Sequence, residues 1–193
     1  MRIEPATGLL DAARQVASPN HDERPPGSAP ELVVVHCISL PPGEFGGGHI
    51  EALFLNRLDP LAHPYFADVA HLQVSAHVLI RRTGEVIQFV ALERRAWHAG
   101  KSAFCGRECC NDFSIGIELE GTDETPFSEA QYAQLVDITR KIRRHFPLIT
   151  DDHIVGHADI APDRKTDPGP AFDWSHYRGL MLAAASGRPV PRS

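Results

Sequence analysis

The sequence lacks any long apolar run, and this absence excludes a membrane-spanning helix. No window of the 193 residues approaches the roughly 18 consecutive apolar residues that such a helix needs. Residues 1–19 also lack the unbroken apolar core of a signal peptide, because they contain Glu4, Pro5 and Asp11. We therefore expect a soluble, cytoplasmic protein with no membrane partner.

An excess of positive charge is also missing, since the formal net charge is −6. Proteins that bind nucleic acid through its phosphates need a clustered basic surface. The longest basic run, at residues 140–144, falls in a helical pattern and is typical of a solvated helix face. We therefore expect no nucleic-acid partner.

Cysteine is scarce, with four residues in the whole chain. Cys37 stands alone, whereas Cys105, Cys109 and Cys110 crowd one segment, and adjacent cysteines do not suit a disulfide framework. Cys105 and Cys109 also lack the second pair of ligands that a structural zinc site needs. This pattern of cysteines is typical of a protein in a reducing compartment.

The chain has the length of one domain, and its 42% apolar and 23% charged residues are ordinary for a globular protein. We expect a single domain over residues 1–193. Within it, residues 1–30 form an N-terminal arm whose part from 18 to 30 is rich in proline, serine and charge. Residues 186–193 form a flexible tail.

Hydrophobic alternation and a helix-capping signal indicate the secondary structure. In residues 113–120 apolar side chains alternate with polar ones, so Glu118 and Glu120 point away from the apolar face. A helix begins at Ser128, with Gln131 completing a capping box. Strands are predicted at 32–35, 74–81, 86–92 and 113–120, with a hairpin turn at 82–85, and residues 153–157 form a short strand or turn. Helices are predicted at 49–58, from Ser128 and at 173–185. The fold class is α/β, with a central mixed β-sheet flanked by helices.

Two of the eleven histidines, His36 and His157, each end an apolar strand-like run at the edge of a loop. Strand ends place side chains on rigid support at the rim of a sheet. Asp167 follows in a proline-stiffened loop that can return a carboxylate to a neighbouring strand end. Two imidazoles and a carboxylate form a three-ligand set for catalytic zinc, leaving the fourth position for water. Most of the other histidines are better explained as surface or satisfied core residues.

Five sequence blocks, in order, closely resemble the AmpD amidases of the type 2 amidase and peptidoglycan-recognition-protein superfamily. The blocks are VVVHCISLPPGEFGGG, VSAHVLIRRTGEVIQFV, RAWHAG, CNDFSIGIELEGTD and GHADIAPDRKTDPGPAFDW. The resemblance covers about residues 8–180. It implies the type 2 amidase fold, a Zn²⁺ cofactor and hydrolysis of the amide between 1,6-anhydro-N-acetylmuramic acid and L-alanine. An anhydro-muropeptide would then be the substrate of a protein that we expect to be a monomer.

The resemblance also implies the roles of individual residues. The family's three zinc ligands fall on His36, His157 and Asp167. The acidic residue that activates water falls on Glu118, and a lysine that stabilises the carbonyl oxygen falls on Lys165. Glu120 lies on the same strand face as Glu118 and is its rival as general base, unless it is a supporting or surface carboxylate.

Four further positions resemble the family's substrate cleft. Trp97 and His98 match a cleft-lining pair, His77 can donate a hydrogen bond to substrate, and Asn111 matches a substrate contact through its amide. Each also has a plainer interpretation, because a tryptophan or histidine can belong to the core and an asparagine can belong to a turn.

The sequence departs from the wider pattern at two places. Ala76 stands where related amidases often carry tyrosine, a loss that the AmpD group shares and that leaves proton transfer to Glu118. Cys37 follows the first predicted ligand, where AmpD proteins commonly have asparagine. Its thiol is open to oxidation or to joining the metal shell, although a passive role is favoured.

Two rival functions follow from the same resemblance. A muropeptide-binding module without catalysis is disfavoured, because such members usually lack a zinc ligand and this chain keeps all three. An amidase that acts on intact peptidoglycan outside the cytoplasm is disfavoured by the absent signal peptide. The leading function is therefore recycling of cell-wall fragments in a Gram-negative bacterium, which also lowers the muropeptide signal that induces β-lactamase.

Overall fold

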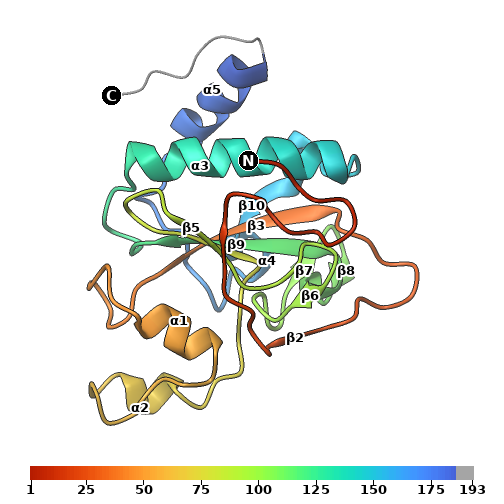
Figure 1. Ribbon diagram of the computed structural model, residues 1–193. Helices are drawn as coiled ribbons and strands as arrows, with labels where there is room; N and C mark the ends of the chain where they lie inside the picture. Colours follow the sequence, from red (N-terminus) through yellow and green to blue (C-terminus); the bar gives the residue numbers. More distant parts are fainter. Residues whose placement is uncertain (186–193) are drawn as a thin grey trace.

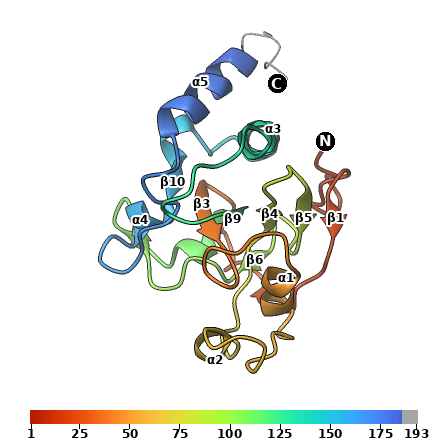
Figure 2. The same ribbon diagram turned by 90° about the vertical axis from the view of Figure 1, so that its left-hand side faces the viewer.

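The computed structural model describes residues 1–185 (Figures 1 and 2). The predicted flexible tail, residues 186–193, lies outside this range. The strands are β1 (Arg14–Gln15), β2 (His21–Asp22), β3 (Leu32–Ile38), β4 (Val78–Ile80), β5 (Val86–Gln88), β6 (Arg95–Ala96), β7 (Ala103–Phe104), β8 (Arg107–Glu108), β9 (Ser114–Glu120) and β10 (Ile154–Gly156). The helices are α1 (His49–Phe54), α2 (Phe66–Val69), α3 (Glu129–His145), α4 (His157–Ile160) and α5 (Trp174–Ala185), and short 3₁₀ turns lie at Cys110–Asp112 and Asp151–His153.

A six-stranded mixed sheet forms the centre of the domain, in the order β1-β5-β4-β9-β3-β10. Only the β4–β5 pair is antiparallel, and the other pairs are parallel. The predicted hairpin is confirmed, although its strands are shorter than predicted. β3 and β9 are the longest strands, and all seven residues of β9 are buried, as expected for a strand covered on both faces. The predicted central mixed sheet is therefore confirmed.

Helix α3 covers one face of this sheet (Figure 1). Ser128 caps the helix and Gln131 completes the capping box, as predicted. The Gln131 amide also donates hydrogen bonds to the carbonyls of Ile80 and Glu120, which ties the first turn to β4 and β9. The apolar face of α3, with Leu135, Ile138 and Ile142, packs on the odd-numbered apolar side chains of β3 and β9. These are Val33, Val35, Ile115, Ile117 and Leu119.

Helices α1 and α2 lie against the opposite face (Figure 2). Ile50, Leu53, Phe54 and Phe66 pack there in one apolar cluster with side chains that include Leu79 of β4. The polar side of β9, with Glu118 and Glu120, therefore faces the layer that holds these helices. The predicted alternation along residues 113–120 is correct, but its polar face is buried rather than exposed to solvent.

The N-terminal arm is part of the domain rather than a loose lead-in. Leu10 is 1% exposed, and β1 adds a strand to the edge of the main sheet beside β5. Arg24, within the part of the arm that is rich in proline, serine and charge, donates hydrogen bonds of 2.8–3.2 Å to backbone carbonyls. The acceptors belong to five residues, namely Leu92, Glu93, Asn111, Asp112 and Ser114. Burial, with a smaller effect of Arg95, lowers the pKa of the Arg24 guanidinium to about 10, so it stays charged at neutral pH.

Replacing Arg24 tests whether the arm stabilises the domain. We expect Arg24→Met to lower the free energy of unfolding by on the order of 3 kcal/mol, because several carbonyls lose a charged donor. Arg24→Lys will also destabilise, since an ammonium cannot reproduce the planar fork. Urea denaturation measures the change, with Arg2→Met as control because the Arg2 side chain is 91% exposed. Equal stability of the Arg24 and Arg2 variants would show that the arm contributes little.

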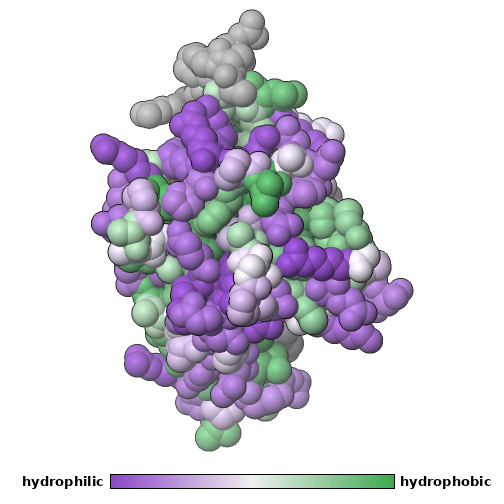
Figure 3. Space-filling model, turned by 90° about the vertical axis from the view of Figure 1, so that its right-hand side faces the viewer, coloured by the Kyte–Doolittle hydropathy of each residue, from purple (hydrophilic) through white to green (hydrophobic). Residues whose placement is uncertain are grey.

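Figure 3 shows one face of the surface, where apolar side chains are scattered among polar ones. Within residues 1–185, no helix combines the length and apolar character that crossing a membrane requires.

Candidate active site

Three donor atoms from distant parts of the chain meet at the sheet edge. His36 Nδ1 lies 3.0 Å from His157 Nδ1 and 3.0 Å from Asp167 Oδ2, and His157 Nδ1 lies 3.2 Å from the same oxygen. Both histidines are at most 3% exposed. Among the described residues, these three form the only cluster of side chains suited to hold a metal ion.

Strand register explains why the two histidines meet. His36 lies in β3 and pairs directly with Glu118 of β9. Gly156, the last residue of β10, pairs with Val35, so His157 follows at once beside His36. Because β3, β9 and β10 are parallel, their carboxyl ends lie at one edge of the sheet, where ligands of α/β folds commonly bind.

Asp167 reaches this edge through close packing of its loop. The Ala158 N–H donates a hydrogen bond of 2.9 Å to the Asp167 carbonyl. Pro168 lies directly over Gly156, where a Cβ atom would approach the Pro168 ring to 2.8 Å. A side chain at Gly156 would therefore push Asp167 away from the histidines.

The electrostatics of the cluster fit a cation site. Burial lowers the pKa of His36 to about 4, although Asp167 opposes this effect, so the imidazole is neutral. Burial alone would raise the pKa of Asp167, but the adjoining His157 and His36 outweigh it and hold that pKa well below its usual range. Two imidazoles and one carboxylate are a donor set that zinc accepts.

The spacing of the three atoms also fits zinc. Ligand atoms around a tetrahedral ion with bonds of about 2.0–2.1 Å lie about 3.3 Å apart. The observed separations of 3.0–3.2 Å are close to this value. The residues present therefore fit the implied ion without rearrangement of the strands.

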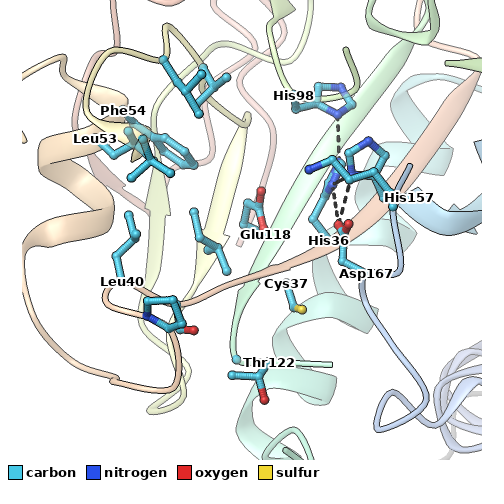
Figure 4. A pocket seen from close by; sticks show the side chains of 18 of the residues that line it. His36, Cys37, Leu40, Leu53, Phe54, His98, Glu118, Thr122, His157 and Asp167 are labelled. Atoms are coloured by element: carbon cyan, nitrogen blue, oxygen red, sulfur yellow. Dashed lines mark hydrogen bonds and ion pairs between the residues drawn. The ribbon is translucent and has the colours of Figure 1, made fainter. Parts of the chain in front are cut away.

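Glu118 lies beside the three donors (Figure 4). Its Oε2 is buried and has no hydrogen-bond partner among residues 1–185. Burial and the neighbouring Asp167 raise its pKa well above the usual value, and Lys165 opposes the shift. A buried carboxylate without a partner is costly, and such groups are typical of functional sites.

Glu120, the rival base, is held elsewhere. Its Oε1 accepts hydrogen bonds from Arg81 at 2.8 Å and from the Gly46 N–H at 2.7 Å, and its Oε2 accepts one from the Arg82 N–H at 3.1 Å. Glu120 is 2% exposed. It therefore anchors the glycine-rich loop to β9, as a supporting carboxylate, and is not free to move a proton.

The cluster opens into a pocket of about 510 Å³. One wall carries the donors, and the other is apolar and comes from the loop after β3 and from α1 and α2 (Figure 4). Lys165 also lines the pocket. The apolar residues are Leu40, Leu53, Phe54, Tyr65, Val69, Leu72 and Val74. The sequence did not predict this wall, because apolar residues in and near short helices are normally interpreted as part of the hydrophobic core.

The predicted cleft residues have different outcomes. Trp97 and His98 both line the pocket, and the Trp97 indole donates a hydrogen bond of 3.1 Å to Asp22 Oδ1. A contact of either residue with substrate stays a prediction. Asn111 is not among the pocket-lining residues, and its Oδ1 instead accepts hydrogen bonds from the backbone N–H groups of His98 and Ala99.

The predicted substrate contact of His77 is not supported by the structure. The side chain is 0% exposed, and both ring nitrogens are engaged by the backbone. Nδ1 accepts from the Gly116 N–H at 3.0 Å, so Nε2 carries the proton and donates to the Arg94 carbonyl at 3.0 Å. Burial and the nearby Arg24 lower the pKa of His77 to about 3. This histidine holds the chain around β4 and β9 together.

Cys37 lies near the donors but points to a different partner. Its thiol donates a hydrogen bond of 3.3 Å to Asp123 Oδ1. Burial and Asp123 raise the pKa of the thiol, so it stays protonated and is a poor metal ligand. This contact favours the passive role.

Comparison with known proteins identifies the family of this chain. A family model described as N-acetylmuramoyl-L-alanine amidase matches residues 26–170. The chain belongs to the N-acetylmuramoyl-L-alanine amidase family. It is an amidase, and the resemblance stated from the sequence blocks is confirmed.

Individual relatives of this amidase agree. The 1,6-anhydro-N-acetylmuramyl-L-alanine amidase AmpD of Enterobacter cloacae is 59% identical over 178 residues, which are 92% of this chain and 95% of the relative. A crystal structure of an AmpD selenomethionine derivative superimposes with a TM-score of 0.91 at 56% identity, covering 94% of this chain and 99% of that one. A complex of Escherichia coli AmiD with anhydro-N-acetylmuramic acid-L-Ala-D-γ-Glu-L-Lys has a TM-score of 0.57 at 28% identity, covering 89% and 67% of the two chains.

Proposed function

We propose that this amidase hydrolyses the amide between the lactyl group of 1,6-anhydro-N-acetylmuramic acid and L-alanine of a stem peptide, with zinc as cofactor. The observation that carries the proposal is the convergence, in one pocket, of three zinc-type donors and a carboxyl group with an unpartnered buried oxygen. The names of the AmpD relatives and the ligand of the AmiD complex support the choice of substrate.

His36 Nδ1, His157 Nδ1 and Asp167 Oδ2 would hold the ion. Bound zinc supplies a Lewis acid that polarises the substrate carbonyl and lowers the pKa of water to about 7. The three donors leave one side of the cluster open to the pocket, so the scissile carbonyl can reach it.

Glu118 moves the proton in this proposal. It takes one proton from the attacking water while the water oxygen bonds to the carbonyl carbon. It then delivers that proton to the alanine nitrogen as the C–N bond breaks, which leaves the lactyl carboxyl group and a free peptide amine. A raised pKa suits a carboxylate that must both accept and return a proton.

Lys165 stabilises the negative charge that develops on the carbonyl oxygen. Its side chain lines the same pocket as the donors, and its charge acts on Glu118. A fixed cation that faces developing charge acts mainly in the transition state.

Lys165→Ala separates this role from metal binding. We expect the variant to keep its zinc and to lose on the order of 10²–10³ in kcat, the usual effect of removing one such stabilising group. Metal analysis and steady-state kinetics measure both properties, with Lys101→Ala as the control at an exposed lysine. Full activity of Lys165→Ala would remove Lys165 from the mechanism.

Mass spectrometry of products from a defined anhydro-muropeptide tests the proposed reaction. We expect the anhydro-sugar and the intact peptide, and no products when a chelator is present. Binding without cleavage would instead identify a muropeptide-binding module. Equal or faster release of peptide from intact peptidoglycan would favour an amidase of the cell wall itself.

The cellular role follows from this substrate. In the proposal the enzyme works in the cytoplasm and recycles wall fragments. Cleavage of those fragments would also lower the muropeptide signal that induces β-lactamase.

A further inference from the structure

The two histidines of the donor cluster are both supported by one short segment, His98–Ala99. His36 Nε2 lies 2.9 Å from His98 Nδ1, and His157 Nε2 lies 3.1 Å from the Ala99 carbonyl oxygen. The second ring nitrogen of each donor histidine therefore contacts one of these two consecutive residues. Figure 4 shows His98 standing over His36 on the side away from Asp167.

We propose that the His98–Ala99 segment, fixed by Asn111, holds His36 and His157 in the tautomer that presents both Nδ1 lone pairs to the metal ion. His98, Ala99 and Asn111 are positioning residues in this view. The inference rests on the proposed function, because it requires that these histidines bind zinc.

The Ala99 contact sets the tautomer of His157. A carbonyl oxygen can only accept a hydrogen bond, so His157 Nε2 must carry the proton and donate it. Nδ1 is then left unprotonated, and this is the atom that lies 3.2 Å from Asp167 Oδ2. No side chain is needed for this selection.

The His98 ring does the same for His36. The His98 ring lies between two partners, His36 and Ser114, and in either neutral tautomer one ring nitrogen donates while the other accepts. Its Nε2 lies 3.1 Å from the hydroxyl oxygen of Ser114, which can accept the proton of that nitrogen. His98 Nδ1 is then free to accept from His36 Nε2, which leaves His36 Nδ1 as the metal donor.

Two features keep the segment in place. The backbone N–H groups of His98 and Ala99 donate to Asn111 Oδ1, at 3.1 and 2.8 Å. The His98 ring also rests on β9 at Gly116, where a Cβ atom would approach its Cγ and Nδ1 to 2.5 Å. A glycine is therefore required under the ring. Loss of a supporting partner of this kind typically lowers metal affinity by about 10–100-fold.

Zinc affinity of His98 variants tests the inference directly. Chelator competition on purified protein should give a zinc dissociation constant about 10–100-fold higher for His98→Leu than for the original chain. His98→Asn should restore most of the affinity, because its Oδ1 can occupy the place of Nδ1. His98→Gln should not, because its amide reaches the position of Nε2.

A second pair of variants tests the anchor. Asn111→Leu should weaken zinc binding although Asn111 does not line the pocket, and Asn111→Asp should preserve it, because a carboxylate oxygen still accepts both N–H groups. In the zinc-loaded protein, the proton on His36 Nε2 should be visible by NMR and protected from exchange. It should lose that protection in His98→Leu.

Each outcome separates this inference from the proposed function. If the original chain binds no zinc, the proposed function fails and the inference falls with it. If the original chain binds zinc and His98→Leu binds it equally well, or His98→Asn is as weak as His98→Gln, only the inference is overturned. Should His98→Leu fail to fold, the contrast between Asn and Gln decides.

Discussion

Glu118→Gln should lower kcat on an anhydro-muropeptide by on the order of 10³ while leaving zinc bound, because general acid–base catalysis contributes about 10²–10⁴. Glutamine has nearly the same shape as glutamate, so the buried position beside β3 stays filled. An amide cannot take a proton from water at neutral pH, and it cannot return one to the alanine nitrogen. The substrate dissociation constant should change little, since the loss concerns the transition state.

Glu108→Gln is the matched control, because Glu108 is an exposed carboxylate on β8 that the pocket does not include. Its turnover should equal that of the original chain. If Glu118→Gln keeps most of its activity, another group must move the proton. Glu120 is poorly placed to do so, since its oxygens already accept three hydrogen bonds.

His36→Ala should abolish both zinc binding and hydrolysis. It removes one of three donors from a buried site and leaves Asp167 with a single imidazole partner. The expected loss in kcat is on the order of 10³ or more, since the ion both polarises the carbonyl and activates water. Metal content and peptide release are measured on the same sample.

His71→Ala serves as the control for general effects of losing a histidine, because His71 is exposed. Treating the original chain with a chelator should reproduce the inactivity of His36→Ala, and added zinc should restore only the original chain. Hydrolysis by metal-free protein at the original rate would contradict the zinc mechanism.

Much of this site was accessible from local sequence patterns. His36 and His157 each follow an apolar strand run, and parallel strands bring their carboxyl ends to one edge. The alternation along β9 correctly placed Glu118 on the face opposite Ile115 and Ile117, which pack against α3 in the structure. The cap at Ser128 was also predicted, because capping depends on side chains three residues apart.

The order of the strands in the sheet could not be predicted from these local patterns. The pairing of β9 between β4 and β3 joins residues far apart in sequence, and no local signal encodes it. The direct pairing of His36 with Glu118 was therefore not predicted, and the family resemblance supplied only the roles of the two residues.

Burial of polar residues was also hard to predict. His77 resembles a site histidine in sequence, yet its ring is fully enclosed and bound by the backbone. Arg24 lies in a proline-rich stretch typical of the surface, but its five carbonyl partners come from segments 68 to 90 positions away. The role of Asn111 under His98 likewise depends on contacts formed only in the folded chain.

X-ray absorption spectroscopy of the zinc-loaded protein, combined with its crystal structure, tests the central claim most directly. The account predicts one zinc per chain, bound to two imidazole nitrogens from His36 and His157 and one carboxylate oxygen from Asp167, with the fourth ligand coming from outside the protein. An ion bound to other side chains, or a fourth protein atom that closes the coordination sphere, would contradict it.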